Sequence, residues 1–442
     1  MGPPVDPVQT DEKLPARTDV VVIGGGIAGV STALHLATKG VDVVLCEKGE
    51  IAGEQSSRNW GWVRKMARDP RELPLIIESL RQWEQLNNTV GAETGFRSTG
   101  IMFLCETDAQ VAAREAWLEH ARQYQLDTRL IGPDEIAKLL PGATRRWKAA
   151  LYTASDGRGE PQMAAPAIAA AARVRGARVF TRCAVRGIET RGGRVAGVVT
   201  EKGRIDCDSV VLAGGAWSRL FCGNLGLNLP QLKVRSSVFR TAAVEGGPET
   251  AAVGSGFGYR KRLDGGYNVG YALNTHAEIV PDSFRLFFDF LPALRIERKA
   301  LKLRVSERFM QEWRTPRRWG LAEVSPFEKT RVLDPAPIDS DLASARKHLA
   351  ETFPLFANVP VAQGWAGYID VTPDAVPVIS PVESVPGFFI ATGFSGHGFG
   401  IGPGAGRLMA ELVTGDAPCV DPSPFRFSRF SDGSKPRPQV GI

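Results

Sequence analysis

The sequence has few of the residues that build metal centres or disulfide frameworks. Five histidines and six cysteines are spread over 442 residues. No two cysteines form a C-x-x-C pair, and none stands near histidines at the spacing of a zinc site. We therefore expect no metal, reduced thiols and a cytoplasmic protein.

Long apolar runs and strong charge clusters are also missing. Since no stretch of about 18 apolar residues occurs, we expect no transmembrane segment. Met1–Arg17 lacks the apolar core of a signal peptide. The net charge is only +6, and no basic stripe carries interleaved aromatics, so nucleic acid is not an expected partner. The mild positive charge either attracts anionic substrates or simply belongs to a soluble basic surface.

Glycine, in contrast, is abundant, and one glycine cluster lies between an expected strand and an expected helix. Gly24-Gly25-Gly26-Ile27-Ala28-Gly29 follows an expected strand at Asp19–Ile23 and opens an expected helix at Ile27–Lys39. A second strand is expected at Val41–Cys46. A G-x-G-x-x-G sequence within a strand–helix–strand unit is the fingerprint of dinucleotide-binding proteins. The sequence therefore predicts a dinucleotide site at the edge of a parallel sheet.

Each residue of this unit has a distinct physical task. Gly24 permits the tight turn, Gly26 lets the backbone approach a pyrophosphate, and Gly29 lets helix and strand pack closely. The start of the helix offers N–H groups and a positive dipole end to the phosphates. Glu47 ends the second strand, where its carboxylate can accept hydrogen bonds from ribose hydroxyls.

Two further glycine turns favour FAD over NAD. Ser209–Ser218 contains a buried strand that runs into Gly214-Gly215, and Phe388–Gly400 contains a strand followed by a loop with four glycines. Such loops let backbone N–H groups approach a flat cofactor or its phosphate chain.

Together with Thr372-Pro373-Asp374, these motifs resemble the D-amino-acid oxidase/glycine oxidase/sarcosine oxidase superfamily of FAD-dependent oxidoreductases, from Asp19 to about Thr414. The sequence is most similar to the sarcosine oxidase-like and opine or D-amino-acid dehydrogenase-like branch. The resemblance implies an α/β plus antiparallel β fold. In that fold a Rossmann-like FAD-binding domain carries an inserted, mostly antiparallel substrate domain.

The order of elements sets the expected domain boundaries. We expect a flexible tail at 1–16, a discontinuous FAD-binding domain at 17–95, 150–228 and 335–425, a substrate-binding domain at 96–149 and 229–334, and a C-terminal tail at 426–442. A hairpin is predicted around Asp264-Gly265-Gly266. A basic helix is predicted from Arg295 to Trp313. Its basic face could bind a membrane surface or an electron-acceptor protein, or it could simply be exposed to solvent. A closing helix is expected from Gly404.

The resemblance also implies which residues contact the cofactor. Ser56, Ser57 and Arg58 lie on a loop that meets the pyrophosphate or flavin, the backbone of Val185 meets the adenine, and Gly396–Phe399 lines the pyrimidine side of the flavin. The full expected set is Gly24, Gly26, Ile27, Ala28, Gly29, Glu47, Lys48, Ser56, Ser57, Arg58, Val185, Ala213, Gly214, Trp217, Gly393, Gly396, His397, Gly398, Phe399 and Gly400.

Three positions depart from the pattern of the monomeric sarcosine oxidases. Gly367 stands where those enzymes anchor FAD through a cysteine, so FAD is expected to be non-covalent here. Gly400 replaces a lysine that helps to bind the substrate carboxylate, and Asn268 replaces the lysine that activates oxygen. The last change leans toward a dehydrogenase, so the electron acceptor is either oxygen or an unidentified partner.

The candidate catalytic residues are Arg64, His397, Tyr259 and Tyr271. An arginine binds a carboxylate best through two parallel hydrogen bonds. Arg64 matches a carboxylate-binding arginine of the superfamily, while Arg260 and Arg262 beside the hairpin are alternatives. His397 is expected to place a hydrogen bond or a charge near the flavin. His276 is expected at the surface, with an active-site base as the alternative. The aromatic residues that could close the site are Trp60, Trp62, Tyr259, Tyr271, Trp365 and Tyr368.

These features predict an FAD-dependent enzyme that oxidises the C–N bond of a small-molecule amino acid. Hydride transfer to flavin N5 would give an imine, which hydrolyses. A secondary or N-substituted amino acid, of the sarcosine, iminodiacetate or opine type, is the first expectation. The alternatives are a D-amino-acid oxidase or dehydrogenase, a 2-hydroxy-acid dehydrogenase of the same fold, and a subunit that holds FAD without catalysis.

Overall fold

The first sheet of the computed structural model carries the predicted strand–helix–strand unit. The structure describes residues 2–272, 274–298, 300–434 and 436–438. β1 (Val20–Ile23), α1 (Ile27–Thr38) and β2 (Val43–Cys46) follow one another as expected. The six strands lie in the order β21-β22-β13-β1-β2-β9, parallel except for β21. The other strands are β9 (Arg178–Phe180), β13 (Ser209–Leu212), β21 (Val378–Pro381) and β22 (Phe388–Thr392).

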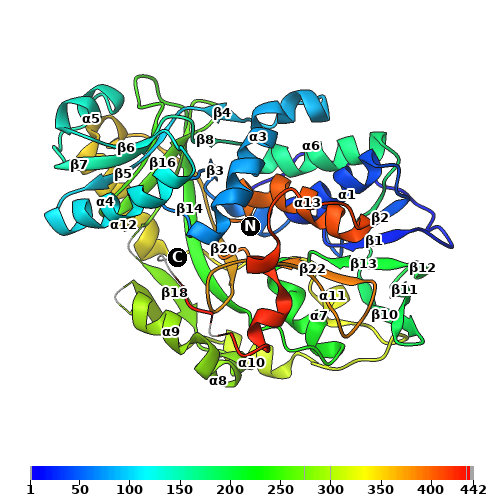
Figure 1. The fold of residues 1–442 in the computed structure, drawn as a ribbon. Helices are drawn as coiled ribbons and strands as arrows, with labels where there is room; N and C mark the ends of the chain where they lie inside the picture. The colour runs from blue at the N-terminus through cyan, green and yellow to red at the C-terminus, as the bar shows by residue number, and fades with distance from the viewer. Residues whose placement is uncertain (1, 273, 299, 435, 439–442) are drawn as a thin grey trace.

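A different layer covers each face of this sheet, so its strands are buried on both sides. Helices α1, α3 (Leu73–Val90), α6 (Pro161–Val174) and α13 (Gly398–Thr414) pack together against one face. The other face is covered by a small antiparallel sheet of β10 (Val185–Arg191), β11 (Arg194–Thr200) and β12 (Gly203–Asp206). Figure 1 shows the helical layer beside β1 and β2, with β10 to β12 beyond them. Fully apolar strands of this kind are typical of parallel sheets covered on both faces.

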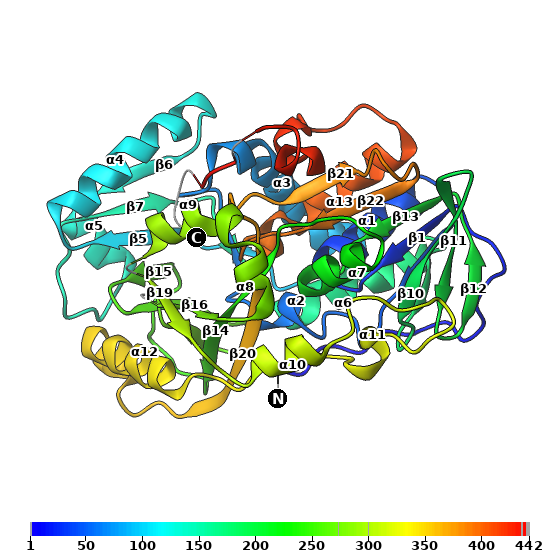
Figure 2. The same ribbon diagram turned by 90° about the horizontal axis from the view of Figure 1, so that it is seen from below.

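A ten-stranded, mostly antiparallel sheet forms the second half of the molecule (Figure 2). Its order is β19-β18-β14-β17-β16-β15-β5-β7-β6, and β20 pairs with β14. The strands are β5 (Ile101–Cys105), β6 (Thr128–Ile131), β7 (Ala149–Thr153), β14 (Leu232–Thr241), β15 (Ala251–Gly254), β16 (Phe257–Lys261), β17 (Tyr267–Gly270), β18 (Thr275–Glu278), β19 (Leu301–Arg304) and β20 (Val361–Val371). The hairpin predicted around Asp264 is confirmed, because it joins β16 to β17.

Short elements and helices complete the chain. They are α2 (Gln55–Arg58), β3 (Trp62–Val63), η1 (Pro70–Glu72), β4 (Arg97–Ser98), α4 (Asp108–Gln123), α5 (Pro133–Leu139), β8 (Gly157–Arg158), η2 (Gly215–Trp217), α7 (Ser218–Asn224), α8 (Pro281–Arg285), α9 (Phe287–Glu297), α10 (Arg308–Arg314), α11 (Pro326–Lys329), α12 (Asp339–Thr352), η3 (Pro354–Phe356), η4 (Ser423–Phe425) and η5 (Phe427–Phe430).

Two expectations for the middle of the chain are wrong. Residues 335–371 were expected in the FAD-binding domain, yet α12 packs on β16 and β17, and β20 pairs with β14 along its length. The basic helix expected from Arg295 to Trp313 is instead the end of α9, strand β19 and helix α10. The pairing of β19 with β18 explains the break, since Leu301 and Leu303 alternate with charged residues at strand spacing.

The two expected tails are bound to the body of the protein over most of their described length. The N–H of Asp6 donates to the Gln162 carbonyl (3.1 Å) and that of Asp11 to the Val179 carbonyl (2.8 Å). Near the other end, the Arg429 guanidinium, 3% exposed, donates to both oxygens of the buried Asp374 carboxylate (3.1 and 3.2 Å). An ion pair of this burial fixes its segment, and it gives the Thr-Pro-Asp motif a structural task.

Candidate active site

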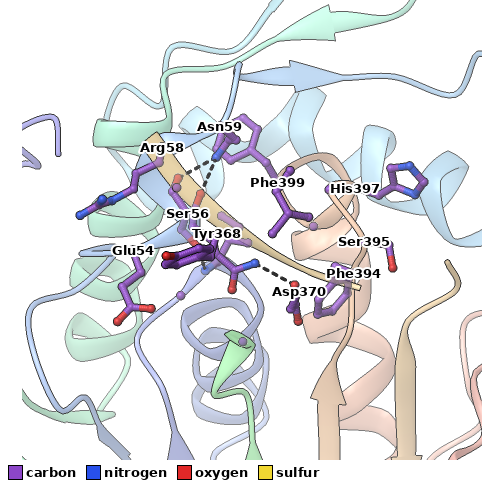
Figure 3. Close-up of a pocket in the computed structure, with 18 of the residues that line it drawn as sticks. Glu54, Ser56, Arg58, Asn59, Tyr368, Asp370, Phe394, Ser395, His397 and Phe399 are labelled. Carbon is purple, nitrogen blue, oxygen red and sulfur yellow. Dashed lines mark hydrogen bonds between the residues drawn. The ribbon is translucent and has the colours of Figure 1, made fainter. Parts of the chain in front are cut away.

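One cavity of about 790 Å³ runs between the two sheets. At one end it is lined by the glycine turn after β1 and by Glu47 and Lys48 after β2. Its middle is lined by β14 and β20 residues and by the segment 394–399, and its far end by Arg64, Phe103 and Arg114. Figure 3 shows Ser56, Arg58 and Asn59 on one side of the cavity and Phe394, Ser395, His397 and Phe399 on the other. A cavity of this volume and lining is suited to an extended cofactor, with a substrate beside the arginines.

The glycine turn is built around very short backbone contacts. Gly24 has φ +111°, a conformation that favours glycine. A Cβ on Gly29 would stand 2.0 Å from the Gly24 carbonyl oxygen, so only glycine lets α1 pack this close to β1. Ser56 Oγ accepts from the Ile27 N–H (2.8 Å), while Gly26 caps α1 without a side chain. The turn therefore leaves open backbone facing the cavity.

The acidic residue after β2 is held by two backbone donors. Glu47 accepts from the N–H of Gly25 (2.7 Å) and of Gly49 (2.6 Å), and its burial raises its pKa. Lys48 is also fixed, because its Nζ donates to Glu54 Oε1 (2.8 Å) and lies 4.5 Å from the centre of the Trp217 ring. Trp217 Nε1 donates to the same Glu54 carboxylate (3.0 Å).

A buried carboxylate joins the two sheets beside the cavity. Asp370, 2% exposed, lies near the end of β20. Its carboxylate accepts from Gln55 Nε2 (2.8 Å), Gln231 Nε2 (2.9 Å) and the Gly393 N–H (2.8 Å). Figure 3 labels Asp370 and draws a dashed line to its carboxylate. These donors come from α2, from the segment before β14 and from the end of β22.

Three arginines gather at the far end of the cavity. Arg64 and Arg68 follow β3, and Arg114 comes from α4. The guanidinium carbons of Arg64 and Arg114 lie 5.2 and 4.7 Å from the centre of the Phe103 ring. Within the described ranges, no carboxylate lies within 4.0 Å of the three guanidinium groups. Burial, and next the charge of Arg68, lower the pKa of Arg64. This end of the cavity is thus suited to an anion.

His397 reaches the cavity as half of a buried pair. Its Nδ1 lies 3.0 Å from Glu72 Oε2, and the two residues are 6% and 0% exposed. Burial, followed by the nearby Arg68 and Arg64 charges, holds the pKa of His397 well below its usual range. Burial raises the pKa of Glu72 to about 8. The geometry therefore fits a neutral pair in which the protonated Glu72 donates to Nδ1.

Comparison with known proteins assigns the family. The FAD dependent oxidoreductase family matches residues 19–412, which is most of the chain. The chain belongs to this family. It is an FAD-dependent enzyme of amino acid oxidation, as the resemblance of its motifs to this superfamily implied.

Several relatives cover nearly the whole chain. L-amino acid deaminase from Proteus myxofaciens, solved in complex with anthranilate, is 35% identical with a TM-score of 0.93, over 98% of this chain and 97% of that one. Glycine oxidase from Pseudomonas aeruginosa is 26% identical over 92% of this chain and 97% of its own length. D-amino acid dehydrogenase from Bradyrhizobium diazoefficiens is 24% identical over 93% and 99%.

The residues of the cavity fit FAD. A side chain on Gly24 or Gly25 would meet the Ala213 carbonyl (2.4 Å) or Ile51 (2.6 Å), so the turn keeps a bare backbone where a pyrophosphate would lie. The same cavity is lined by Val185 and Glu47 near this turn and by segment 394–399 further along. Within the described part of the chain, no helix has the length and apolar character needed to cross a bilayer.

Most of the predicted cofactor residues line the cavity. They are Gly24, Gly26, Ile27, Ala28, Glu47, Lys48, Ser56, Arg58, Val185, Ala213, Gly214, Trp217, Gly396, His397, Gly398 and Phe399. Four others do not. Gly29 packs on Gly24, and Ser57 is a buried residue of α2. The Gly393 N–H donates to Asp370, and Gly400 lies within α13, where its carbonyl accepts from Trp83 Nε1 (2.9 Å). The closing helix begins at Gly398, earlier than predicted, which turns Gly400 away.

Two of the predicted catalytic and carboxylate-binding residues lie elsewhere. Tyr259, 1% exposed, packs against Phe257, Tyr267 and Phe353 in the core of the second half and does not line the cavity. Arg260, 0% exposed, donates to both oxygens of Glu160 (2.6 and 2.8 Å), so its guanidinium is already paired.

Other predicted residues also face away from the cavity. Arg262 donates to Asn268 Oδ1 (3.1 Å), so neither side chain is directed to the cavity. His276 is buried, not at the surface as expected, and its Nε2 lies 2.8 Å from Asp341. Trp365 Nε1 donates to the Arg58 carbonyl (3.0 Å). Arg64, His397 and Tyr271 do line the cavity, with Trp60, Trp62 and Tyr368.

Sequence reasoning missed three residues of the site. Arg68 stands four positions after Arg64 in the same loop, a spacing that could have drawn attention to it. Glu72 is four positions after Arg68, and nothing in the sequence indicates its contact with His397. Arg114 is one of several cations on an amphipathic helix, and only the packing of α4 over Phe103 brings it to the cavity.

Substitution of Glu72 by glutamine is expected to change how stability depends on pH. The folded chain keeps the Glu72 proton up to pH about 8, whereas the unfolded chain releases it near 4.5. The folded state therefore holds more protons in this window. The bound Glu72 proton therefore contributes to the free energy of unfolding, and this contribution is complete below pH 4.5. As pH rises from there to about 8, the contribution is lost by up to about 1.4 kcal/mol per pH unit.

Thermal unfolding of the holoenzyme between pH 5 and 9 tests this expectation. Glu72→Gln keeps a donor for His397 Nδ1 but cannot ionise, so its melting temperature should fall less steeply with pH than that of the wild type. Glu84→Gln, on the exposed side of α3, is the matched control and should follow the wild type. Parallel curves for wild type and Glu72→Gln would show that Glu72 does not hold a proton in this range.

Proposed function

We propose that this enzyme catalyses the oxidative deamination of an L-α-amino acid. The observation that carries the proposal is Arg64, a partly buried guanidinium that lines the cavity, without a carboxylate partner among the described residues. The similarity to L-amino acid deaminase from Proteus myxofaciens supports the L configuration. Anthranilate, bound in that relative, carries an amine and a carboxylate on adjacent carbons, as an α-amino acid carries both on one.

In this proposal the protein positions the amino acid and excludes water. Arg64 binds the α-carboxylate through parallel N–H···O bonds and so orients the Cα–H bond toward the flavin. Phe103, Trp62 and Trp117 line the same end of the cavity and keep it apolar around the reacting carbon. The neutral His397 adds no positive charge there, so the substrate amine is not repelled by a nearby imidazolium. Tyr271, stacked at 6.3 Å on His348, forms part of the wall.

FAD, when bound, takes up the hydride and thereby the two electrons of the C–H bond. The substrate amine, uncharged when the hydride leaves, would become an iminium ion, which loses a proton to water and is hydrolysed to a 2-oxo acid and ammonia. We propose that FAD is held non-covalently. Gly367 cannot form a thioether, and Cys46, the one cavity-lining cysteine among the described residues, lies next to Glu47 at the end of β2.

A second candidate is the oxidation of an N-substituted amino acid. The similarity to sarcosine oxidase subunit beta from Rhodobacter capsulatus favours this reaction, because sarcosine is N-methylglycine and Arg64 would hold its carboxylate in the same way. The two candidates differ at the nitrogen, since an N-alkyl substrate yields an aldehyde or 2-oxo acid together with an amine.

Anaerobic bleaching of the flavin absorbance of the purified holoenzyme tests the proposal. The panel contains L- and D-α-amino acids, N-methyl and N-carboxymethyl glycines, and 2-hydroxy acids. We expect L-amino acids to reduce the flavin and to release ammonia and a 2-oxo acid. Reduction only by D-amino acids or N-substituted glycines would overturn the choice of substrate. Reduction only by 2-hydroxy acids would overturn amine oxidation in this site. Reoxidation on admission of air then separates oxygen from another acceptor.

A further inference from the structure

We propose that the substrate is an amino acid with a second anionic group, such as a second carboxylate, which Arg114 binds. This inference rests on the proposed function, because it takes Arg64 as the ligand of the α-carboxylate. It goes beyond that function by naming the class of substrate. Three guanidinium groups line one end of the cavity, and a single α-carboxylate cannot use them all.

The inner two arginines suffice for one carboxylate. Arg68 is 2% exposed, and its Nε donates to the Arg64 carbonyl oxygen (3.2 Å). Its Nη1 is buried without a hydrogen-bond partner. Arg64 donates through Nη1 to the Met66 carbonyl, which leaves its other N–H groups for a ligand. A buried donor without a partner is costly, so the pair is built for an oxygen that the substrate brings.

Arg114 is a separate cation from a different element. It projects from α4 and shares the Phe103 ring with Arg64, while Arg68 does not contact that ring. The Arg114 charge is close enough to Arg64 to help to lower the pKa of Arg64, after burial and the charge of Arg68. Like charges held together in a cavity are stabilised when an anion lies between or beside them.

The acidic groups nearby are already occupied. The Asp156 carboxylate accepts from the N–H groups of Lys65 (2.8 Å) and Met66 (3.2 Å). Burial raises the pKa of Glu72 to about 8, so this carboxyl is weakened as a counter-charge near neutral pH, and Asp156 is the one charged acidic group among the described residues that remains beside Arg64. The Glu72 carboxyl is directed to His397. The positive charge is therefore left for the ligand.

The expected preference for an acidic substrate follows from how an uncharged substrate side chain would interact with Arg114. An apolar group placed against Arg114 would take water from the guanidinium and give it no acceptor. Charge-assisted hydrogen bonds contribute about twice as much as neutral ones. We therefore expect a preference of about 100-fold for an acidic side chain over its uncharged isostere.

The first experiment measures binding without turnover. The absorbance of the oxidised flavin in the holoenzyme is titrated with glutarate and with pentanoate, which have the same chain length but two and one carboxylates. Glutarate is expected to bind about 100-fold more tightly. In Arg114→Gln this difference should vanish, and in Arg122→Gln, an exposed residue of α4 paired with Glu119, it should remain.

The second experiment measures turnover with L-glutamate, L-glutamine, L-aspartate and L-leucine. Higher kcat/KM for the acidic substrates, lost in Arg114→Gln through a raised KM for them alone, supports the inference. Equal use of neutral and acidic substrates overturns it and leaves the proposed function intact. A loss in Arg114→Gln that is equal for both classes also overturns it, since that loss is structural. Tight glutarate binding without reduction by any amino acid would retain the dianion site and remove the proposed function.

Discussion

Replacement of Arg64 by methionine is expected to lower kcat/KM for the amino acid substrate by about 30- to 4000-fold. Truncation of one partner in a desolvated, hydrogen-bonded charge pair costs about 2–5 kcal/mol, and each 1.4 kcal/mol is a factor of ten. Methionine fills much of the volume of arginine and can still pack on Phe103, so the fold should be unchanged. Stopped-flow bleaching of the flavin under anaerobic conditions measures the effect.

Arg64→Lys is the matched control, because it keeps the positive charge of arginine and removes the planar guanidinium group. Lysine keeps one positive charge but cannot form two parallel N–H···O bonds, so we expect an intermediate rate. Flavin content and melting temperature should be equal in wild type and both variants. An unchanged kcat/KM in Arg64→Met would show that Arg68 or Arg114 holds the α-carboxylate and that the assignment of Arg64 is wrong.

Gly29→Ala is expected to abolish the folded, flavin-containing enzyme. The new Cβ would stand 2.0 Å from the Gly24 carbonyl oxygen, a backbone atom of the turn between β1 and α1, and the Cβ itself is fixed to the backbone of α1. Because neither side can yield as a flexible side chain would, we expect a destabilisation of about 3 kcal/mol or more. The yield of soluble protein, the flavin bound per chain and the melting temperature measure this loss.

Gly26→Ala separates the stability of the turn from cofactor binding. Its Cβ would lie 3.1 Å from Ser56 Oγ, a side-chain atom that can move by a few tenths of an ångström. The chain should therefore fold, while the added methyl group projects where the phosphates approach α1, so FAD retention should fall. If Gly29→Ala retained flavin and melted with the wild type, the close packing of α1 on β1 would not be required.

The sequence predicted the parts of the fold that depend on local signals. The strand–helix–strand unit from Val20 to Cys46, strand β13 and strand β22 lie where runs of buried apolar residues and glycine turns indicated them. The β16–β17 hairpin followed from its glycine turn. These signals are short in range, since turn chemistry and apolar runs act over a few residues.

The parts that failed depend on partners far away in the chain. Tyr259 belongs to a strand whose two faces are both buried, so its side chain could not be assigned to the cavity from alternation. Arg260 is not free to bind a substrate because Glu160, 100 positions earlier in the chain, pairs with its guanidinium. The domain of β20 depended on pairing with β14 more than 100 residues before it. Pairing over such distances leaves no mark in a single sequence.

The carboxylate of Asp370 has a consequence for how the amino acid enters and leaves. Donors from both sheets converge on this one buried group, so a swing of one half of the molecule against the other would break several hydrogen bonds in a place that water does not reach. The two halves are therefore expected to behave as one rigid body throughout turnover. Exchange of substrate and product then depends on displacement of local segments such as α4, and hinge closure should not limit the rate.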